Sequence, residues 1–164
     1  MSHPMRIDHR DKFPEHERIT LARKPHVLVA DDDDDMRALI VAALGEDGYE
    51  VSEARNGREL LDRVAPSMLF DEASHAPDVI VTDVRMPGVN GLSVLAGLRD
   101  TGWATPIILI TAFDRDQIHA QGVELGADAV FHKPFDVDDL RTAVLNLLSA
   151  GGWRWRAPTL PDTS

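Results

Sequence analysis

The chain of 164 residues contains no cysteine, which excludes a disulfide framework and a thiolate metal site. It also lacks any hydrophobic run that approaches the roughly 18–20 residues needed to cross a bilayer. Met1 to Lys24 is polar and charged throughout, so the N-terminus shows no signal-peptide pattern. These absences predict a cytoplasmic setting without membrane attachment.

Acidic residues outnumber basic ones by 28 to 17, which gives a formal net charge of −11. The excess lies within residues 25–150, whereas residues 1–24 and 151–164 are slightly basic. Direct nucleic-acid binding depends on neutralising phosphates, so an acidic body argues against it. The length and the 43% hydrophobic content suit one domain with a sizeable core. We expect a polar N-terminal arm (1–24), one domain (25–150) and a C-terminal tail or linker start (151–164).

Short β-rich runs alternate with amphipathic segments between residues 26 and 149. Three of these runs are almost wholly apolar, which is typical of strands buried on both faces of a parallel sheet. In the other segments hydrophobic residues recur every three or four positions, and Asp114 and Asp136 are candidate N-caps. The pattern predicts an α/β fold, a flavodoxin-like αβα sandwich with five helices and five parallel strands in the order 2-1-3-4-5. The expected strands are His26–Ala30, Tyr49–Glu53, Asp78–Thr82, Pro106–Ile110 and Ala129–His132.

Five consecutive aspartates, from Asp31 to Asp35, directly follow the first predicted strand. In open α/β sheets, ligands bind at the carboxyl ends of the strands. Several carboxylates cannot gather there as anions without a like-charge penalty, which a hard cation such as Mg²⁺ would remove. Asp31 and Asp32 are the expected metal ligands. The alternative is an acidic helix N-terminus that the helix dipole favours, and the run alone leaves both open.

Three further polar side chains are expected at the same edge, because each stands where a predicted strand ends. They are Asp83, Thr111 and Lys133. A single aspartate at a strand end is often turn chemistry, and a lysine before proline is usually a solvated turn residue. Together they suit phosphoryl transfer to a carboxylate, with Asp83 as the nucleophile. Mg²⁺ and Lys133 would supply positive charge, and the Thr111 hydroxyl would donate a hydrogen bond.

Over residues 25–150 the chain resembles the receiver domain of two-component response regulators. Each matching segment is weak alone, but the ordered set at the family's spacing is specific. The segments are Val29-Ala30-Asp31-Asp32-Asp33, Thr82-Asp83-Val84-Arg85-Met86-Pro87-Gly88, Ile110-Thr111-Ala112 and Lys133-Pro134-Phe135, together with Asn56-Gly57 and Leu125-Gly126-Ala127-Asp128.

The resemblance implies that Asp83 accepts a phosphoryl group from a sensor histidine kinase or a phosphotransfer protein. Asp32, Asp83 and the main-chain carbonyl of Arg85 would bind Mg²⁺ directly, with Asp31 assisting through water. Thr111 and Lys133 would contact the phosphoryl group and report it to the face around the fifth strand. The chain would then signal to a downstream protein target, with a homodimer allowed. It would be a phosphoprotein and not an enzyme, since it assists only its own phosphorylation and dephosphorylation.

The chain departs from the family pattern three residues before the lysine, where Val130 replaces the usual Tyr or Phe. That aromatic residue is the family's rotameric switch. The neighbouring Phe131 should point to the opposite face of the sheet, so it cannot substitute. We hypothesise that the aromatic part of the switch is missing or replaced, and that the output differs accordingly.

A second departure is the span between Asn56-Gly57 and Asp83, which is about seven or eight residues longer than usual. The surplus is expected in residues 65–76, as an extended helix or a loop. A tolerated surface insertion is the simpler interpretation. The sharper one is a partner surface, because Met68, Leu69 and Phe70 are apolar.

Three further positions carry smaller expectations. The resemblance places Arg85 and Phe113 beside the path of the hydrolytic water, and bulky Phe113 predicts a long-lived acyl phosphate. The Trp153–Arg156 segment is expected to start a linker, although its two tryptophans could instead cap the body or a partner. His132 is expected to be a structural or surface residue rather than a phosphorelay donor.

Four functions follow from these observations. The first is a stand-alone receiver, and the second is a receiver fragment of a longer transcriptional regulator. A haloacid-dehalogenase-like phosphatase is disfavoured, because its Asp-x-Asp-x-Thr/Val motif would end in Asp35 and no cap domain is present. A flavodoxin-type flavin binder is disfavoured too, because five aspartates would repel a phosphate after the first strand.

Overall fold

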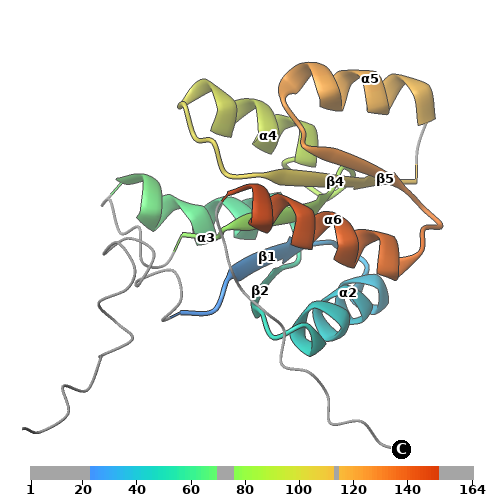
Figure 1. Ribbon diagram of the computed structural model, residues 1–164. Helices are drawn as coiled ribbons and strands as arrows, with labels where there is room; N and C mark the ends of the chain where they lie inside the picture. The colour runs from blue at the N-terminus through green and yellow to red at the C-terminus, as the bar shows by residue number, and fades with distance from the viewer. Residues whose placement is uncertain (1–22, 70–75, 113–114, 152–164) are drawn as a thin grey trace, which may run out of the picture.

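The computed structural model describes residues 23–69, 76–112 and 115–151, which form a layered α/β fold (Figure 1). Five parallel strands make one sheet in the order β2-β1-β3-β4-β5. The predicted flavodoxin-like topology is confirmed. The strands are β1 (His26–Ala30), β2 (Glu50–Ala54), β3 (Val79–Asp83), β4 (Ile107–Thr111) and β5 (Ala129–His132).

Helices cover both faces of the sheet. In the described residues they are α2 (Asp34–Glu46), α3 (Gly57–Leu69), α4 (Gly91–Asp100), α5 (Arg115–Leu125) and α6 (Val137–Ala150). Residues of α2 and α6 share one buried cluster with Val27 and Val29 of β1. Residues of α3, α4 and α5 pack with Leu28 and Ala30 of the same strand, on the other face. Successive strand residues point to opposite faces, so β1 contributes to both halves of the predicted αβα sandwich.

Three strands lie one residue further along the chain than predicted, namely β2, β3 and β4. At β4 the cause is Pro106, which has no N–H to donate to the sheet. Its carbonyl still accepts from the N–H of Ile80, at 2.9 Å. At β2 the N–H of Tyr49 instead donates to the carbonyl of Leu44 at the end of α2, at 3.4 Å. The hydrophobic pattern of the sequence contains no information about either of these backbone hydrogen bonds.

Asp33 and Asp136 cap two helices. The Asp33 side chain accepts hydrogen bonds from the N–H groups of Asp35 and Met36 at the start of α2. The Asp136 side chain accepts from the N–H of Asp138 at the start of α6, at 2.9 Å, which confirms that predicted cap. Asp114, the other candidate, lies outside the described residues. The aspartates after Asp32 thus lie at the start of a helix. For this part of the five-aspartate run, the alternative of an acidic helix N-terminus is confirmed.

The longer span before β3 begins as helix. α3 continues into residues 65–69 and includes Pro66, which removes one hydrogen bond of the helical ladder. The extended-helix interpretation is therefore confirmed for these residues. Residues 70–75 lie outside the described part, so the partner surface around Phe70 stays a prediction.

Val130 and Phe131 point to opposite faces of β5, as predicted. Val130 packs against the cluster beneath α3, α4 and α5. Phe131 packs against the α2 and α6 cluster, where its ring centroid lies 5.8 Å from that of Phe135. Phe131 therefore does not occupy the position that Val130 leaves without an aromatic ring.

None of the helices in the described ranges has the length and apolar content of a membrane span.

Candidate functional site at the carboxyl edge of the sheet

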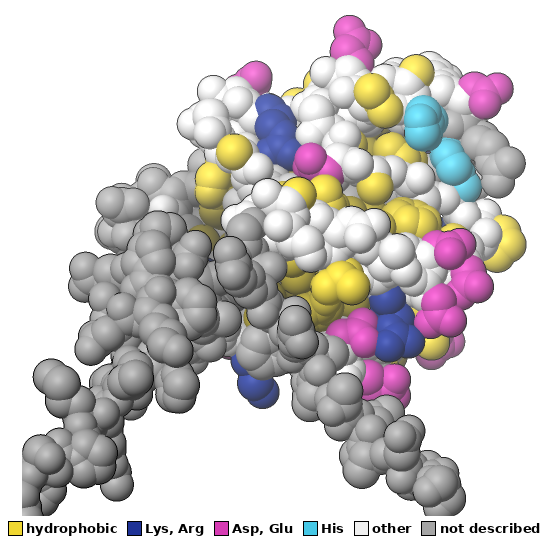
Figure 2. All heavy atoms as spheres, in the orientation of Figure 1, with side chains coloured by type: hydrophobic (Ala, Val, Ile, Leu, Met, Phe, Trp, Pro, Cys, Tyr) yellow, Lys and Arg dark blue, Asp and Glu magenta, His cyan; other side chains and the backbone are white. Residues whose placement is uncertain are grey.

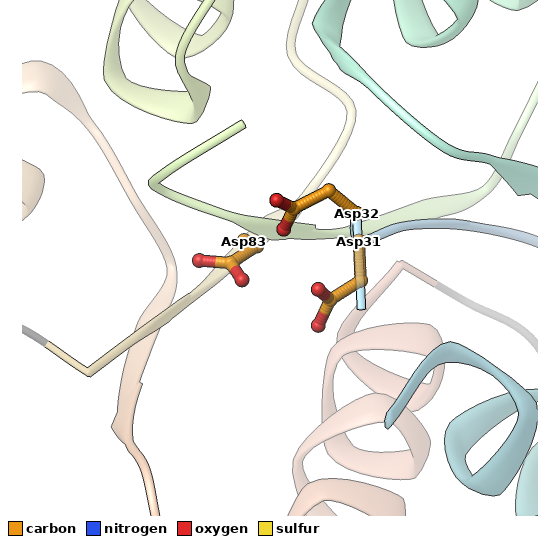
Figure 3. Close-up of side chains that lie close together, drawn as sticks. All are labelled: Asp31, Asp32 and Asp83. Atoms are coloured by element: carbon orange, nitrogen blue, oxygen red, sulfur yellow. The ribbon is translucent and has the colours of Figure 1, made fainter. Parts of the chain in front are cut away.

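Three carboxylates meet where the neighbouring strands β1 and β3 end. Asp31 and Asp32 directly follow β1, and Asp83 is the last residue of β3. Carboxylate oxygens from all three lie within 4.8 Å of one another. Figure 3 shows the three side chains gathered at this edge. Asp31 and Asp83 are buried, with 1% and 6% of their surface exposed, whereas Asp32 is open to solvent.

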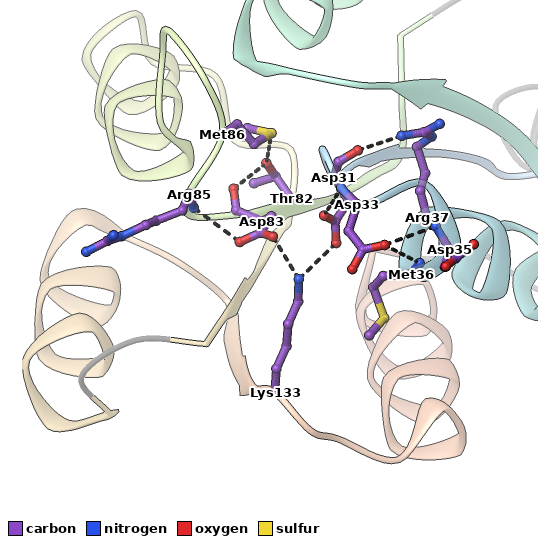
Figure 4. Close-up of polar contacts among 10 residues, drawn as sticks. All are labelled: Asp31, Asp33, Asp35, Met36, Arg37, Thr82, Asp83, Arg85, Met86 and Lys133. Atoms are coloured by element: carbon purple, nitrogen blue, oxygen red, sulfur yellow. Dashed lines mark hydrogen bonds and ion pairs between the residues drawn. The ribbon is translucent and has the colours of Figure 1, made fainter.

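Lys133 brings a positive charge to the two buried carboxylates (Figure 4). Its Nζ lies 2.8 Å from Asp83 Oδ2 and 3.3 Å from Asp31 Oδ2. Burial alone would lower the pKa of Lys133. Hydrogen bonds and charges from Asp83 and Asp31 outweigh that effect and raise the pKa above its ordinary value. The ammonium is therefore retained well beyond neutral pH, which makes it a fixed cation in this site.

The environment of Asp31 disfavours the ionised form of its carboxyl group. Burial raises the pKa of its carboxyl above the ordinary 3.8, and the charge of Asp83 raises it further. The N–H of Asp33, which donates to Asp31 Oδ1 at 2.9 Å, and the charge of Lys133 act in the opposite direction. The net upward shift shows that one lysine does not fully compensate two buried carboxylates, so further positive charge would stabilise this site.

Asp83 is fixed from three sides. Its Oδ1 accepts a hydrogen bond from the N–H of Arg85 at 3.1 Å, while its Oδ2 faces Lys133. Behind it, Gly91 at the start of α4 lies so close that a Cβ there would overlap the carbonyl oxygen of Asp83. The backbone contact of α4 therefore sets the position of the β3 end.

Thr111 completes the predicted set at the end of β4. The residue is fully buried, and its carbonyl accepts a hydrogen bond from the N–H of Lys133 at 2.8 Å. This bond ties the β4 end to the lysine that faces Asp83. The peptide bond after Lys133, to Pro134, is cis.

The turn after β3 lines an open hollow of about 420 Å³ beside Asp32. Its wall is formed by Asp32, Arg85, Met86, Pro87, Gly88 and Asn90. Asp32, at the acidic edge, thus lies on the wall of an open hollow that water and small molecules can enter.

Arg37 was missed by the sequence reasoning. Its guanidinium donates to the Asp31 carbonyl at 2.8 Å and also pairs with Asp34 and Glu53. The spacing of Asp34 and Arg37 favours an ion pair on one helix face. Nothing in the sequence shows that the same side chain reaches back to the strand end. Arg37 thus holds the backbone from which Asp31 and Asp32 project.

The donor set fits a hard divalent cation. Carboxylate oxygens are preferred ligands of Mg²⁺, and burial, together with the nearby charge of Asp83, raises the pKa of Asp31, so a cation beside it would favour the ionised form. Two of the three carboxylates are buried and one faces solvent, which leaves room for the waters that Mg²⁺ usually retains. The acidic cluster is therefore suited to bind a metal ion.

Comparison with known proteins identifies the family. The family model for the response regulator receiver domain matches residues 27–145. The chain belongs to the response regulator receiver family. It is 38% identical over 122 residues to response regulator MprA of Mycolicibacterium vanbaalenii, an alignment that covers 74% of this chain and 49% of that protein. The chain thus spans about half the length of the curated relatives that it matches.

Solved receiver structures agree. The receiver domain of Francisella response regulator 1452 matches with a TM-score of 0.68 and 34% identity, covering 77% of this chain and 98% of that one. The signal receiver domain of the putative response regulator NarL from Mycobacterium tuberculosis matches with a TM-score of 0.66 and 31% identity, covering 77% and 98%. Family membership places this receiver in two-component signal transduction, where response regulators interact with histidine kinases and downstream targets.

Proposed function

We propose that this receiver accepts a phosphoryl group on Asp83 in a Mg²⁺-dependent reaction and signals by a conformational change to a protein partner. The observation that carries the proposal is the placement of Asp83. It is a buried carboxylate at a strand end, with one oxygen 2.8 Å from a lysine ammonium and two further carboxylates beside it. A carboxylate can act as a covalent nucleophile toward phosphorus.

The donor is a phosphorylated histidine of a sensor kinase or a phosphotransfer protein. An oxygen of Asp83 forms a bond to phosphorus while the phosphorus–nitrogen bond of the donor breaks. The electron pair of that bond remains on the imidazole. Because both reactants are anionic, the transfer needs positive charge at the phosphoryl oxygens. Lys133 stays protonated through its contacts with Asp83 and Asp31 and supplies part of that charge.

The acidic cluster supplies the rest by holding Mg²⁺. Asp32, Asp83 and the main-chain carbonyl of Arg85 are the proposed direct ligands, with Asp31 assisting through water. When bound there, Mg²⁺ would neutralise negative charge on the carboxylates and would act as a Lewis acid toward the phosphoryl group. Asp31 must be ionised to take part, and its raised pKa means that metal binding weakens as the pH falls into the carboxyl range.

Thr111 and Lys133 are the proposed residues that respond to phosphorylation of Asp83. The Thr111 hydroxyl is proposed to donate to a phosphoryl oxygen, and Lys133 to form an ion pair with it. Lys133 contacts both buried carboxylates, and its N–H is hydrogen-bonded to the Thr111 carbonyl. A shift of its ammonium would therefore displace the ends of β4 and β5 together. The face formed by α5, β5 and α6 is the proposed output surface, and it binds a protein target or a second copy of the receiver. The net charge of −11 argues that this surface does not bind nucleic acid directly.

The chain acts on itself alone under this proposal, because it assists only its own phosphorylation and dephosphorylation. The test is the intact mass after incubation with a small phosphoryl donor such as phosphoramidate, with and without Mg²⁺. We expect one phosphoryl adduct that requires Mg²⁺ and is absent in Asp83→Asn. Asp100→Asn, an exposed aspartate at the end of α4, is the matched control and should be labelled like the unmodified chain. An adduct that survives in Asp83→Asn would refute Asp83 as the acceptor.

A second candidate concerns the context of the receiver rather than its chemistry. As a stand-alone receiver, the chain would act through protein contacts or pass phosphate along a relay. As the receiver part of a longer transcriptional regulator, it would control an attached output domain. The relatives' greater length favours the second. The mass of the protein detected by immunoblot in source cells separates them, since only the second exceeds 18.1 kDa substantially.

A further inference from the structure

Two histidine side chains lie side by side away from the acidic edge. His119 belongs to α5, and His132 is the last residue of β5. Their ring centroids are 6.1 Å apart, with an angle of 27° between the ring planes. His119 is exposed and His132 is half-buried. Figure 2 shows histidine side chains gathered on the molecular surface in this view.

We propose that His119 and His132 form a binding site for a divalent transition-metal cation of the zinc class. Imidazole nitrogens bind such cations at about 2.0–2.1 Å, which places the cation roughly 3.2 Å from each ring centre. Two rings that share one cation then have centres roughly 5.2 Å apart in tetrahedral geometry and 6.4 Å apart in linear geometry. The observed 6.1 Å lies between these limits, so the spacing of the two rings fits a shared cation once both side chains rotate to turn one nitrogen of each nearly parallel ring toward a common point.

The chemistry of this site differs from that of the acidic edge. Imidazole suits Zn²⁺, Cu²⁺ and Ni²⁺, whereas Mg²⁺ prefers oxygen ligands. The only three-residue metal cluster in the described ranges is the aspartate group, so those ranges offer two histidine ligands here, and water can fill further coordination positions. Each imidazole has a second nitrogen, which can keep a hydrogen bond while the first binds the cation.

A cation here would join α5 to the end of β5. β5 is an edge strand whose residues are all partly exposed, and α5 contacts it through close packing of Gly122 against Val130. His132 directly precedes Lys133, the residue that faces Asp83 and Asp31. The bound cation therefore restrains the helix next to the strand that carries the site lysine.

The test is calorimetric titration of the full chain with Zn²⁺ in saturating Mg²⁺, which keeps the acidic edge occupied. Four more histidines lie outside the described residues, namely His3, His9, His16 and His75. The variants are therefore His119→Gln, His132→Gln and a control in which those four are all replaced by Gln. Circular dichroism verifies that each variant is folded, and ¹H–¹⁵N spectra of the imidazoles report which rings bind.

We expect one Zn²⁺ site whose affinity falls roughly tenfold or more in either single variant and is unchanged in the fourfold control. The ring signals of His119 and His132 should shift together at one equivalent. Unchanged affinity in both single variants, or loss of the site in the fourfold control, would overturn the proposal and leave the pair as a stacking contact.

Discussion

Two glycines of α4 make a matched test of how the helix fixes the β3 end. A Cβ at Gly91 would overlap the Asp83 carbonyl oxygen and lie 3.1 Å from the Val84 Cα. Both atoms are backbone and cannot rotate away, so Gly91→Ala should cost about 1–3 kcal/mol in unfolding free energy. At Gly97 no atom lies within 4 Å of such a Cβ. Gly97→Ala should therefore raise stability by about 0.5–1 kcal/mol, through helix propensity alone.

Urea unfolding of both variants measures the difference. The two should be separated by roughly 1.5–4 kcal/mol, which corresponds to roughly 0.5–4 M in urea midpoint. Gly91→Ala should also slow phosphoryl uptake, because α4 or Asp83 must move to accommodate the methyl group, whereas Gly97→Ala should not. Equal midpoints would show that the contact between α4 and Asp83 does not constrain the site.

Three further changes test other parts of the account. Asp31→Asn should raise the thermal midpoint at neutral pH without Mg²⁺, because folding raises the pKa of Asp31 and its ionised form therefore destabilises the folded chain. The gain should disappear as the pH falls through the raised pKa to below the ordinary value of 3.8. A gain that does not depend on pH would contradict this cause. Arg99→Ala should lower the unfolding free energy by about 2–3 kcal/mol, since the side chain donates to three backbone carbonyls and to Asp128, and Arg99→Lys should restore only part of it in urea titrations. Val130→Tyr should lower the unfolding free energy by about 1–3 kcal/mol and speed amide exchange in α5. α5 packs so closely on this residue that a Cβ at Gly122 would lie 3.2 Å from the Val130 Cγ2, which leaves no room for a ring. Unchanged stability would show that an aromatic residue can be accommodated at this position.

The sequence predicted the fold, and it predicted that the residues proposed for the site gather at one edge of the sheet, for a physical reason. Each buried strand is a short apolar run, and the polar residues at its end mark the edge where parallel strands end. Asp31, Asp83 and Thr111 could thus be assigned to one edge from sequence alone. Family resemblance then gave each residue a proposed role. Strand boundaries were wrong by one residue at three strands, because apolar patterning does not register which backbone groups are available for pairing.

Other features depend on contacts that only the folded chain reveals. Arg99 joins the end of α4 to Gly126 and Asp128, 27 and 29 residues further along the chain. Arg141 of α6 pairs with Asp47, 94 residues away. A charged residue in a helix pattern is expected to face solvent, and its distant partner follows from the tertiary arrangement. The contact of Gly91 with Asp83 likewise depends on the tertiary arrangement and cannot be predicted from the sequence pattern.

The most direct test of the central claim is to locate the phosphoryl group chemically. The receiver is incubated with phosphoramidate and Mg²⁺, reduced with borohydride, digested and mapped by mass spectrometry. Reduction of an aspartyl phosphate yields homoserine, a residue lighter by one oxygen and heavier by two hydrogens. We expect this change at Asp83 alone and only with Mg²⁺. The same change at Asp31 or Asp32, or none at Asp83 in a labelled sample, would contradict the proposed function.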